Sequence, residues 1–147
     1  MIRRATEQDV EQLAGLAVQL WPGHIAQELS CEFAGMMRLE QAAFFLAVED
    51  ARPVGFSQCQ LRRDYVEGTA SSPVGYLEGI FVTEDYRGRG LAKRLLLECE
   101  RWAALQGCRE FASDCELDNN DSLRFHLRMG FCEANRVICF TKQLQEG

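Results

Sequence analysis

Arginine and glycine alternate in one short turn, Arg87-Gly88-Arg89-Gly90, between an apolar segment and a long amphipathic one. The first N–H groups of a helix have no acceptor within it, and the helix dipole adds positive charge there. Glycines let the backbone approach an anion closely, and the arginines add charge. The pattern predicts a site for phosphate oxygens, with an empty surface turn as the alternative. Neither a Walker loop nor the Rossmann fingerprint fits, since Lys93 stands where a third glycine would fall.

Two motifs in this region resemble those of the GNAT superfamily of N-acetyltransferases. The stretch Arg87-x-x-Gly90-x-Ala92 is similar to the acyl-coenzyme A signature Q/R-x-x-G-x-G/A. Further along, Asn119-x-x-Ser122 and His126-x-x-x-Gly130-Phe131 are similar to the segment N-x-x-A-x-x-x-Y-x-x-x-G-F. The resemblance covers nearly the whole chain. It implies a GNAT fold and acetyl-coenzyme A as co-substrate.

The resemblance also implies which residues bind the co-substrate. Strand backbone groups would hold the pantetheine arm, turn amides would hold the pyrophosphate, and one asparagine would touch the cofactor further along. The strand positions are Ile80, Phe81 and Val82. The turn positions are Gly88, Arg89, Gly90, Leu91, Ala92 and Lys93, and the asparagine is Asn119.

A narrower resemblance joins seven separate segments to the aminoglycoside 6'-N-acetyltransferases. These are Leu20-Trp21-Pro22-Gly23-His24, Asp64-Tyr65-Val66, Ser72-Pro73, Leu77-Glu78-Gly79-Ile80-Phe81-Val82, Gly107-Cys108-Arg109-Glu110, Ala112-Ser113-Asp114 and Arg136-Val137-Ile138. The resemblance implies that Trp21, His24, Tyr65, Glu78 and Asp114 contact the aminosugar. Asn135 falls where some close relatives carry a glutamate near the substrate, which implies a shifted drug range. The resemblance also implies a homodimer.

The residue types support this chemistry without the resemblance. Polycationic sugars need carboxylates for their ammonium groups and aromatic rings against their faces. Glu78 interrupts an apolar strand just before the Arg/Gly turn, and Asp114 ends the next predicted strand. Because alkylamines are mostly protonated at neutral pH, a carboxylate must accept a proton before the nitrogen attacks. We expect Glu78 in that role first and Asp114 second, with ammonium recognition as the main task of Asp114.

Each candidate also has a structural interpretation. Glu78 would then be a solvated edge-strand residue, and Asp114 the cap of a turn. Trp21 would anchor the core, and His24 and Tyr65 would be ordinary loop residues.

Two residues bear on how the transfer proceeds. His126 stands where many superfamily members place a tyrosine that protonates the leaving thiolate. A histidine titrates in the right range for this, but we favour a packed helix residue. Cys115 lies beside Asp114, yet we expect direct transfer in a ternary complex, with no acetyl group on the thiol.

Periodicity predicts the elements that position these residues. The expected fold is α/β (α+β), with a mixed, mostly antiparallel sheet flanked by helices, in the order β-α-α-β-β-β-α-β-α-β. We expect strands over 2–5, 44–48, 54–61, 75–82, 110–114 and 137–141. We expect helices over 10–20, with capping residues at 6–9, and over 30–39, 91–106 and 119–129.

Composition bounds the rest. With 147 residues, 47% hydrophobic and 26% charged, the chain predicts a single domain over 1–147. A net charge of -6 argues against nucleic acid or an anionic membrane as partner. No apolar stretch is long enough to span a bilayer, and we expect no secretory signal. Seven cysteines without Cys-x-x-Cys spacing predict reduced thiols in the cytoplasm and no zinc.

Three other functions remain open from the sequence. The same fold would serve if the acceptor were a polyamine, a small metabolite amine or a protein N-terminus. A non-catalytic acyl-coenzyme A sensor would bind the cofactor tightly without transfer. A nucleotide-binding module built on the Arg/Gly turn is the weakest of the three.

Overall fold

The structure is a computed structural model that describes residues 1–145. The chain divides into two compact units, Met1–Asp114 and Cys115–Gly147. The single domain expected over 1–147 stays a prediction, and residues 146–147 lie outside the described residues.

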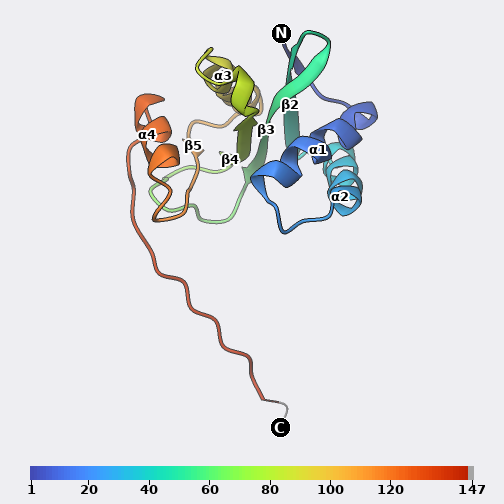
Figure 1. Ribbon diagram of the computed structural model, residues 1–147. Coiled ribbons are helices and arrows are strands. Elements are labelled where there is room, and N and C mark those ends of the chain that lie inside the picture. The colour runs from blue at the N-terminus through green and yellow to red at the C-terminus, as the bar shows by residue number, and fades with distance from the viewer. Residues whose placement is uncertain (146–147) are drawn as a thin grey trace. The chain divides into compact units, whose positions relative to one another are not determined.

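The first unit is built on a five-stranded sheet in the order β1-β2-β3-β4-β5 (Figure 1). Strands β1 to β4 are antiparallel neighbours, and β5 runs parallel to β4. Their bounds are β1 Ile2–Arg4, β2 Ala42–Glu49, β3 Arg52–Arg62, β4 Val74–Val82 and β5 Phe111–Ala112. The sheet is therefore mixed and mostly antiparallel, as the sequence predicts.

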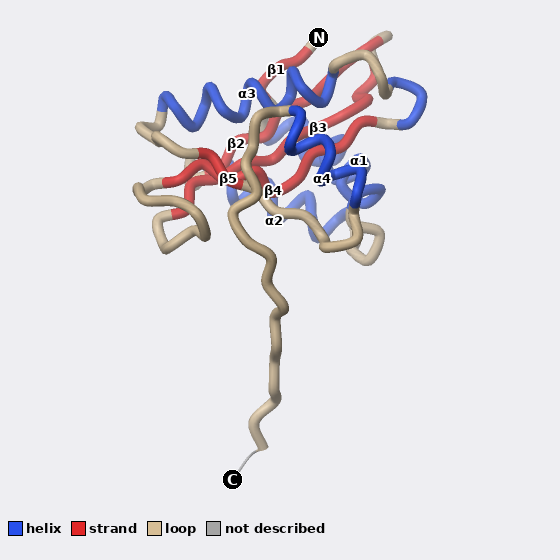
Figure 2. The backbone as a smooth tube through the Cα atoms, turned by 90° about the vertical axis from the view of Figure 1, so that its left-hand side faces the viewer, coloured by secondary structure: helices blue, strands red, loops and turns tan. Residues whose placement is uncertain are grey.

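Helices cover both faces of this sheet, which makes three layers (Figures 1 and 2). Helices α1 (Val10–Leu20) and α2 (Ala26–Arg38) lie on one face, and α3 (Leu91–Leu105) lies on the other. The spacing of apolar residues explains this arrangement, because each helix buries one stripe of its surface. The buried positions are Leu13, Ala14, Leu16 and Ala17 on α1, Leu29 and Phe33 on α2, and Leu91, Leu95, Leu96, Cys99, Trp102 and Ala103 on α3.

A charged cluster fixes the entry to α1. Thr6 caps the 3-10 turn Glu7–Asp9, and its backbone N–H donates to Asp9 Oδ2 at 2.8 Å. The Arg3 guanidinium donates hydrogen bonds to both carboxylate oxygens of Asp9, at 2.9 and 2.8 Å. The bond from Arg3 is the main cause that lowers the pKa of Asp9 to about 2. The capping chemistry expected over residues 6–9 is therefore present.

The second unit contains one helix, α4 (Asn120–Arg128), within residues 115–145. Asn119 caps it, since its Oδ1 accepts from the Ser122 N–H at 3.1 Å. Past Gly130 the chain is an extended segment (Figure 1), and residues 131–145 form neither helix nor strand. The strand predicted over Val137–Thr141 is therefore wrong. A strand requires hydrogen bonds to a neighbour, and none of the described sheet pairings includes this segment.

Candidate functional site

A cavity of about 330 Å³ opens on the α1/α2 face of the sheet. It lies between the end of α1, one side of α2 and strands β3 and β4. Its lining residues are Trp21, His24, Leu29, Glu32, Phe33, Met36, Gln58, Gln60 and Glu78. Three of the predicted substrate-binding residues, Trp21, His24 and Glu78, thus come together around one hollow.

A β-bulge in β4 directs Glu78 toward this cavity. Gln58 on β3 pairs with Gly79 on β4, but the next β3 residue, Cys59, pairs with Leu77. Glu78 is therefore the extra residue of the bulge, opposite no single partner. Because side chains alternate along a strand, the extra residue puts Glu78 and Gly79 on the same face. The carboxylate consequently sits within an otherwise apolar strand and still faces the cavity.

Gly79 lets Trp21 pack directly against the bulge. A Cβ atom at position 79 would lie 2.7 Å from two ring carbons of Trp21 and 3.3 Å from Leu20. The indole also meets the ring of Phe56 edge-on, with centroids 6.1 Å apart, and lies 6.3 Å from that of His24. Trp21 therefore has a structural role, and its contact with the aminosugar stays a prediction. It packs against the core, and it forms one wall of the cavity.

Glu78 is ion-paired. Its Oε1 accepts from Arg62 Nη2 at 2.6 Å, with the two side chains 21% and 38% exposed. The guanidinium of Arg62 also stacks on the Tyr76 ring, 3.5 Å from its centroid. A cation stacked on a ring is held in place by the face of that ring. Arg62 therefore orients the Glu78 carboxylate through its Oε1 atom.

Asp114 belongs to the same network through Tyr76. The Tyr76 hydroxyl donates to Asp114 Oδ2. Burial, and then the bond to Asp114, raise the pKa of Tyr76 above its usual value. The phenol therefore stays protonated at neutral pH and acts as a donor. In consequence Asp114, Tyr76, Arg62 and Glu78 form one continuous chain of contacts at the β3–β4 edge.

The predicted anion site is a turn with the expected geometry. Gly88 and Gly90 have φ angles of +77° and +80°, which L side chains rarely adopt. Gly90 precedes α3, and the first helical bond there runs from Arg94 N to Gly90 O at 3.1 Å. The N–H groups of residues 91–93 thus lie outside the helical ladder. Arg87 Nε donates to Val82 O at 2.7 Å and ties the turn to the end of β4.

The edge of β4 is open next to this turn. Strand β5 pairs with β4 only at Gly75 and Tyr76. Within residues 1–114 no strand pairs with the same edge of β4 over residues 77–82. This edge includes the backbone of Ile80, Phe81 and Val82, for which a role in binding the pantetheine arm is predicted.

The remaining candidates lie elsewhere. Tyr65 is 77% exposed, in the loop between β3 and β4. Asn119 and Asn135 belong to the second unit, where Asn135 Oδ1 accepts from the Arg136 N–H at 2.8 Å. His126 in that unit donates from Nδ1 to Ser122 O at 2.7 Å, and its ring lies 5.1 Å from that of Phe131. These contacts lie within the second unit, and the interpretation of His126 as a packed helix residue stays a prediction.

Sequence reasoning missed several members of the site. Arg62 and Tyr76 connect the two carboxylates, and Glu32, Gln58 and Gln60 line the cavity. The sequence did contain a pattern that could have identified the two glutamines. Gln58 and Gln60 are two positions apart in one strand, so their side chains lie on the same face of the sheet. The ion pair of Arg62 had no such signal, since its partner lies sixteen residues away.

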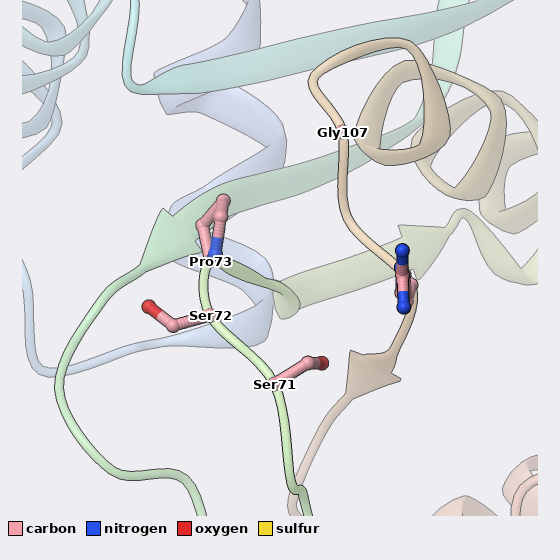
Figure 3. Close-up of a pocket in the computed structure, with 5 residues that line it drawn as sticks. Ser71, Ser72, Pro73 and Gly107 are labelled. Atoms are coloured by element: carbon pink, nitrogen blue, oxygen red, sulfur yellow. The ribbon is translucent and has the colours of Figure 1, made fainter.

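A second hollow of about 340 Å³ contains none of the candidates (Figure 3). Its walls come from the loop before β4 and from the turn after α3, with Ser71, Ser72, Pro73, Gly107 and Arg109 around it. Over residues 1–145 no group of three or more His, Cys, Asp or Glu side chains is placed to hold a metal ion. No helix in that range is long and apolar enough to cross a membrane.

Comparison with known proteins identifies the class to which this fold and turn belong. The model of the acetyltransferase (GNAT) family matches residues 10–131. The chain therefore belongs to the GNAT acetyltransferase family, and the family and fold predicted from the sequence are confirmed.

More similar relatives have narrower names. A protein of Salmonella enteritidis named aminoglycoside N(6')-acetyltransferase type 1 is 40% identical over 97% of this chain and 98% of its own length. A relative of the same name from Stenotrophomonas maltophilia is 38% identical over 98% of this chain and 94% of its own.

Solved structures agree with these relatives. AAC(6')-Iy in complex with the bisubstrate analog CoA-S-monomethyl-acetylneamine superposes with a TM-score of 0.93, at 40% identity, covering 98% of both chains. AAC(6')-Ih from Acinetobacter baumannii gives a TM-score of 0.90 at 36% identity, with 99% of both chains covered.

Proposed function

We propose that this protein transfers an acetyl group from acetyl-coenzyme A to the 6'-amine of an aminoglycoside. The observation that carries the proposal is the cavity at the β4 bulge, which places Glu78 beside Trp21 on the strand that leads into the Arg/Gly turn. A carboxylate and an indole face suit a cationic aminosugar. Relatives of this chain with 38–40% identity carry the corresponding name.

In this proposal the β4 edge and the following turn hold the co-substrate. The backbone of Ile80, Phe81 and Val82 binds the pantetheine arm, and the amides of residues 88–93 bind the pyrophosphate. When bound, acetyl-coenzyme A supplies an activated thioester. Backbone N–H groups at the open edge stabilise negative charge on the thioester oxygen during attack. Asn119 is a further proposed contact with the co-substrate.

Glu78 prepares the amine for attack. The substrate arrives as an ammonium ion, and Glu78 accepts a proton from it directly or through one water. The free nitrogen forms a bond to the acetyl carbon while the carbon–sulfur bond breaks. The nitrogen then loses its remaining excess proton to water, and the coenzyme A thiolate takes up a proton from water, which leaves a neutral amide and a thiol. No acetyl group resides on the protein, and the exposed thiol of Cys115 takes no part.

Asp114 recognises a second ammonium group of the same substrate. Its Oδ2 accepts from Tyr76, which fixes the carboxylate and leaves its other oxygen for the ligand. Trp21 and His24 line the cavity that we propose for the sugar, and Tyr65 in the loop between β3 and β4 is a further proposed contact with it. Asn135, neutral where some close relatives have a carboxylate, shifts the drug range.

We also propose that the protein acts as a homodimer in the cytoplasm. The extended C-terminal segment carries large apolar side chains that are 71–88% exposed, namely Val137, Ile138 and Phe140. A second copy that covers them would remove this apolar surface from water. Seven unpaired cysteines fit a reducing compartment. Light scattering should give twice the 16.7 kDa of one chain, and a monomer mass would contradict the dimer.

The deciding experiment measures thiol release from acetyl-coenzyme A with two matched drugs. One aminoglycoside carries a 6'-amine, and its analogue carries a 6'-hydroxyl. We expect turnover with the amine alone. The enzyme is kept at catalytic concentration, because its seven cysteines would otherwise add to the thiol signal. Binding of acetyl-coenzyme A without turnover of either drug would move the search to polyamines and peptide N-termini.

A further inference from the structure

A buried amide oxygen without a partner lies in the wall of the cavity. Gln58, in the middle of β3, is 4% exposed and lines the cavity next to Glu78. Among the residues that the structure describes, its Oε1 is the one buried side-chain nitrogen or oxygen atom that has no hydrogen-bond partner. Buried polar atoms in folded proteins are nearly always paired, so an unpaired one at a binding cavity requires an explanation.

The orientation of this amide follows from its other contact. Gln58 Nε2 lies 3.6 Å from the Sδ atom of Met36, which also lines the cavity. A thioether sulfur carries no proton and can only accept, so the NH₂ group belongs on this side. The carbonyl oxygen is therefore the unpaired atom, and the missing partner is a donor.

The surroundings of the oxygen specify the kind of donor. Gln58 pairs in register with Gly79, directly beside the bulge that carries Glu78. Glu32 brings a second carboxylate to the same cavity. A wall made of two carboxylates and an amide oxygen attracts positively charged or hydroxyl donors and offers little to an anion.

We propose that Gln58 is a specificity-determining residue whose Oε1 accepts a hydrogen bond from one hydroxyl or ammonium group of the bound aminosugar. The inference rests on the proposed function, because it takes the aminoglycoside as occupant of the cavity. Sites that hydrogen-bond a substrate group discriminate strongly against analogues lacking it, since the buried protein atom is then left unpaired. Gln58 would select among aminosugars while Glu78 handles the reacting amine.

The test uses Gln58→Met, which keeps a side chain of similar length and removes the acceptor. Its KM and kcat are measured with a parent aminoglycoside and with analogues that each lack one hydroxyl or amine. We expect the KM for the parent drug to rise about tenfold, while the KM for acetyl-coenzyme A changes by less than about twofold. For the one analogue that lacks the group bound by Gln58, the variant and the wild type should have the same KM.

The stability of Gln58→Met gives a second readout. Because the substitution removes an unpaired buried oxygen, we expect the free variant to melt at an equal or higher temperature, by up to about 2–4 °C. Gln8→Met, at an exposed position in the turn before α1, is the matched control and should change neither KM nor melting temperature. Gln58→Glu retains an acceptor, so it should bind the parent drug at least as well as Gln58→Met does, and it remains informative if the methionine variant does not fold.

Two results would overturn the inference. If KM rises by the same factor for the parent drug and every analogue, and the melting temperature falls, Gln58 is a structural residue. Unchanged KM values would mean that the oxygen meets no substrate group. If the wild-type enzyme acetylates no aminoglycoside at all, the proposed function fails first and the inference falls with it. The wild-type control therefore separates the two failures.

Discussion

Arg62 and Glu78, which lines the cavity, form an ion pair between neighbouring strands, with Nη2 and Oε1 2.6 Å apart. The pair joins the bulge residue to a guanidinium that is itself stacked on Tyr76. The Glu78 carboxylate, for which we propose a role toward the substrate ammonium, is thus oriented by the protein itself. Orientation of this kind is a large part of what a site contributes to rate.

We expect Arg62→Met to lower kcat/KM for the aminoglycoside about tenfold, because the Glu78 carboxylate loses its orientation. The KM for acetyl-coenzyme A should stay within about twofold, since Arg62 lies away from the Arg/Gly turn. Arg62→Lys should recover part of the loss, as it restores the charge but not the planar contact with Tyr76. Steady-state kinetics with both substrates would check this. If the kinetic parameters for the aminoglycoside and for acetyl-coenzyme A worsen by the same factor, the substitution has damaged the fold instead.

Replacing the bulge carboxylate itself should have a larger effect. Glu78→Gln keeps the shape of the side chain and removes the proposed proton acceptor, so we expect kcat to fall about 100-fold. The dissociation constant for acetyl-coenzyme A, measured by calorimetry, should change little. If cofactor binding weakens as much as turnover, Glu78 is structural and the proton has another acceptor.

Local sequence patterns predicted most of the elements that carry this site. Phe44–Val48 and Gly75–Val82 were expected as strands, and the observed strands β2 and β4 contain them with ends shifted by at most two residues. Helix α3 was expected from its apolar stripe, and the turn before it from its glycines. These features depend on residues close together in the chain, which sequence reasoning handles well.

Features that depend on pairing between distant segments were not predictable in this way. The bulge at Glu78 is a property of the register between β3 and β4, and the sequence of β4 alone does not reveal it. The links from Glu78 to Arg62 and from Tyr76 to Asp114 join residues sixteen and thirty-eight positions apart. The error at Val137–Thr141 has the same origin, since β-prone residues form a strand only where a partner is available.

Gly79 gives a test of how closely the cavity wall is packed. We expect Gly79→Ala to destabilise the protein by about 1–3 kcal/mol and to raise the KM for the aminoglycoside, because its Cβ would lie 2.7 Å from the Trp21 ring. Gly15→Ala is the control, on an exposed part of α1 with no atom within 4 Å of the added carbon. It should stabilise by about 0.5–1 kcal/mol. Urea unfolding measures the stability of the two variants, and steady-state kinetics measure their KM for the drug. A Gly79→Ala variant with normal KM would contradict the packing argument.

The two glycines at the turn allow cofactor binding to be separated from backbone strain. Gly90→Ala forces a side chain into φ +80° and should destabilise by about 1–2 kcal/mol while raising the KM for acetyl-coenzyme A. Gly107→Ala carries the same kind of strain, at φ +92°, just beyond the end of α3 away from the turn. It should lose similar stability with a normal KM. A raised KM in both variants would mean that strain alone weakens cofactor binding.

The Arg3–Asp9 pair predicts how stability depends on pH. Asp9 has its pKa lowered from 3.8 to about 2, so the ionised carboxylate favours the folded state. Its contribution is fully present above pH 3.8 and disappears as the pH falls through about 2. We expect Asp9→Asn to cost about 1–2 kcal/mol at pH 7, and the difference from wild type to shrink as the pH approaches 2.

Urea unfolding of the two proteins at a series of pH values measures this difference directly. Comparing the two cancels the titration of the other carboxylates, which both proteins share. Glu11→Gln, at an exposed site in the first turn of α1, is the matched control, and we expect it to change stability by less than about 0.5 kcal/mol at every pH. A difference for Asp9→Asn that persists unchanged to pH 2 would show that shape, and not the charge on Asp9, stabilises the entry to α1.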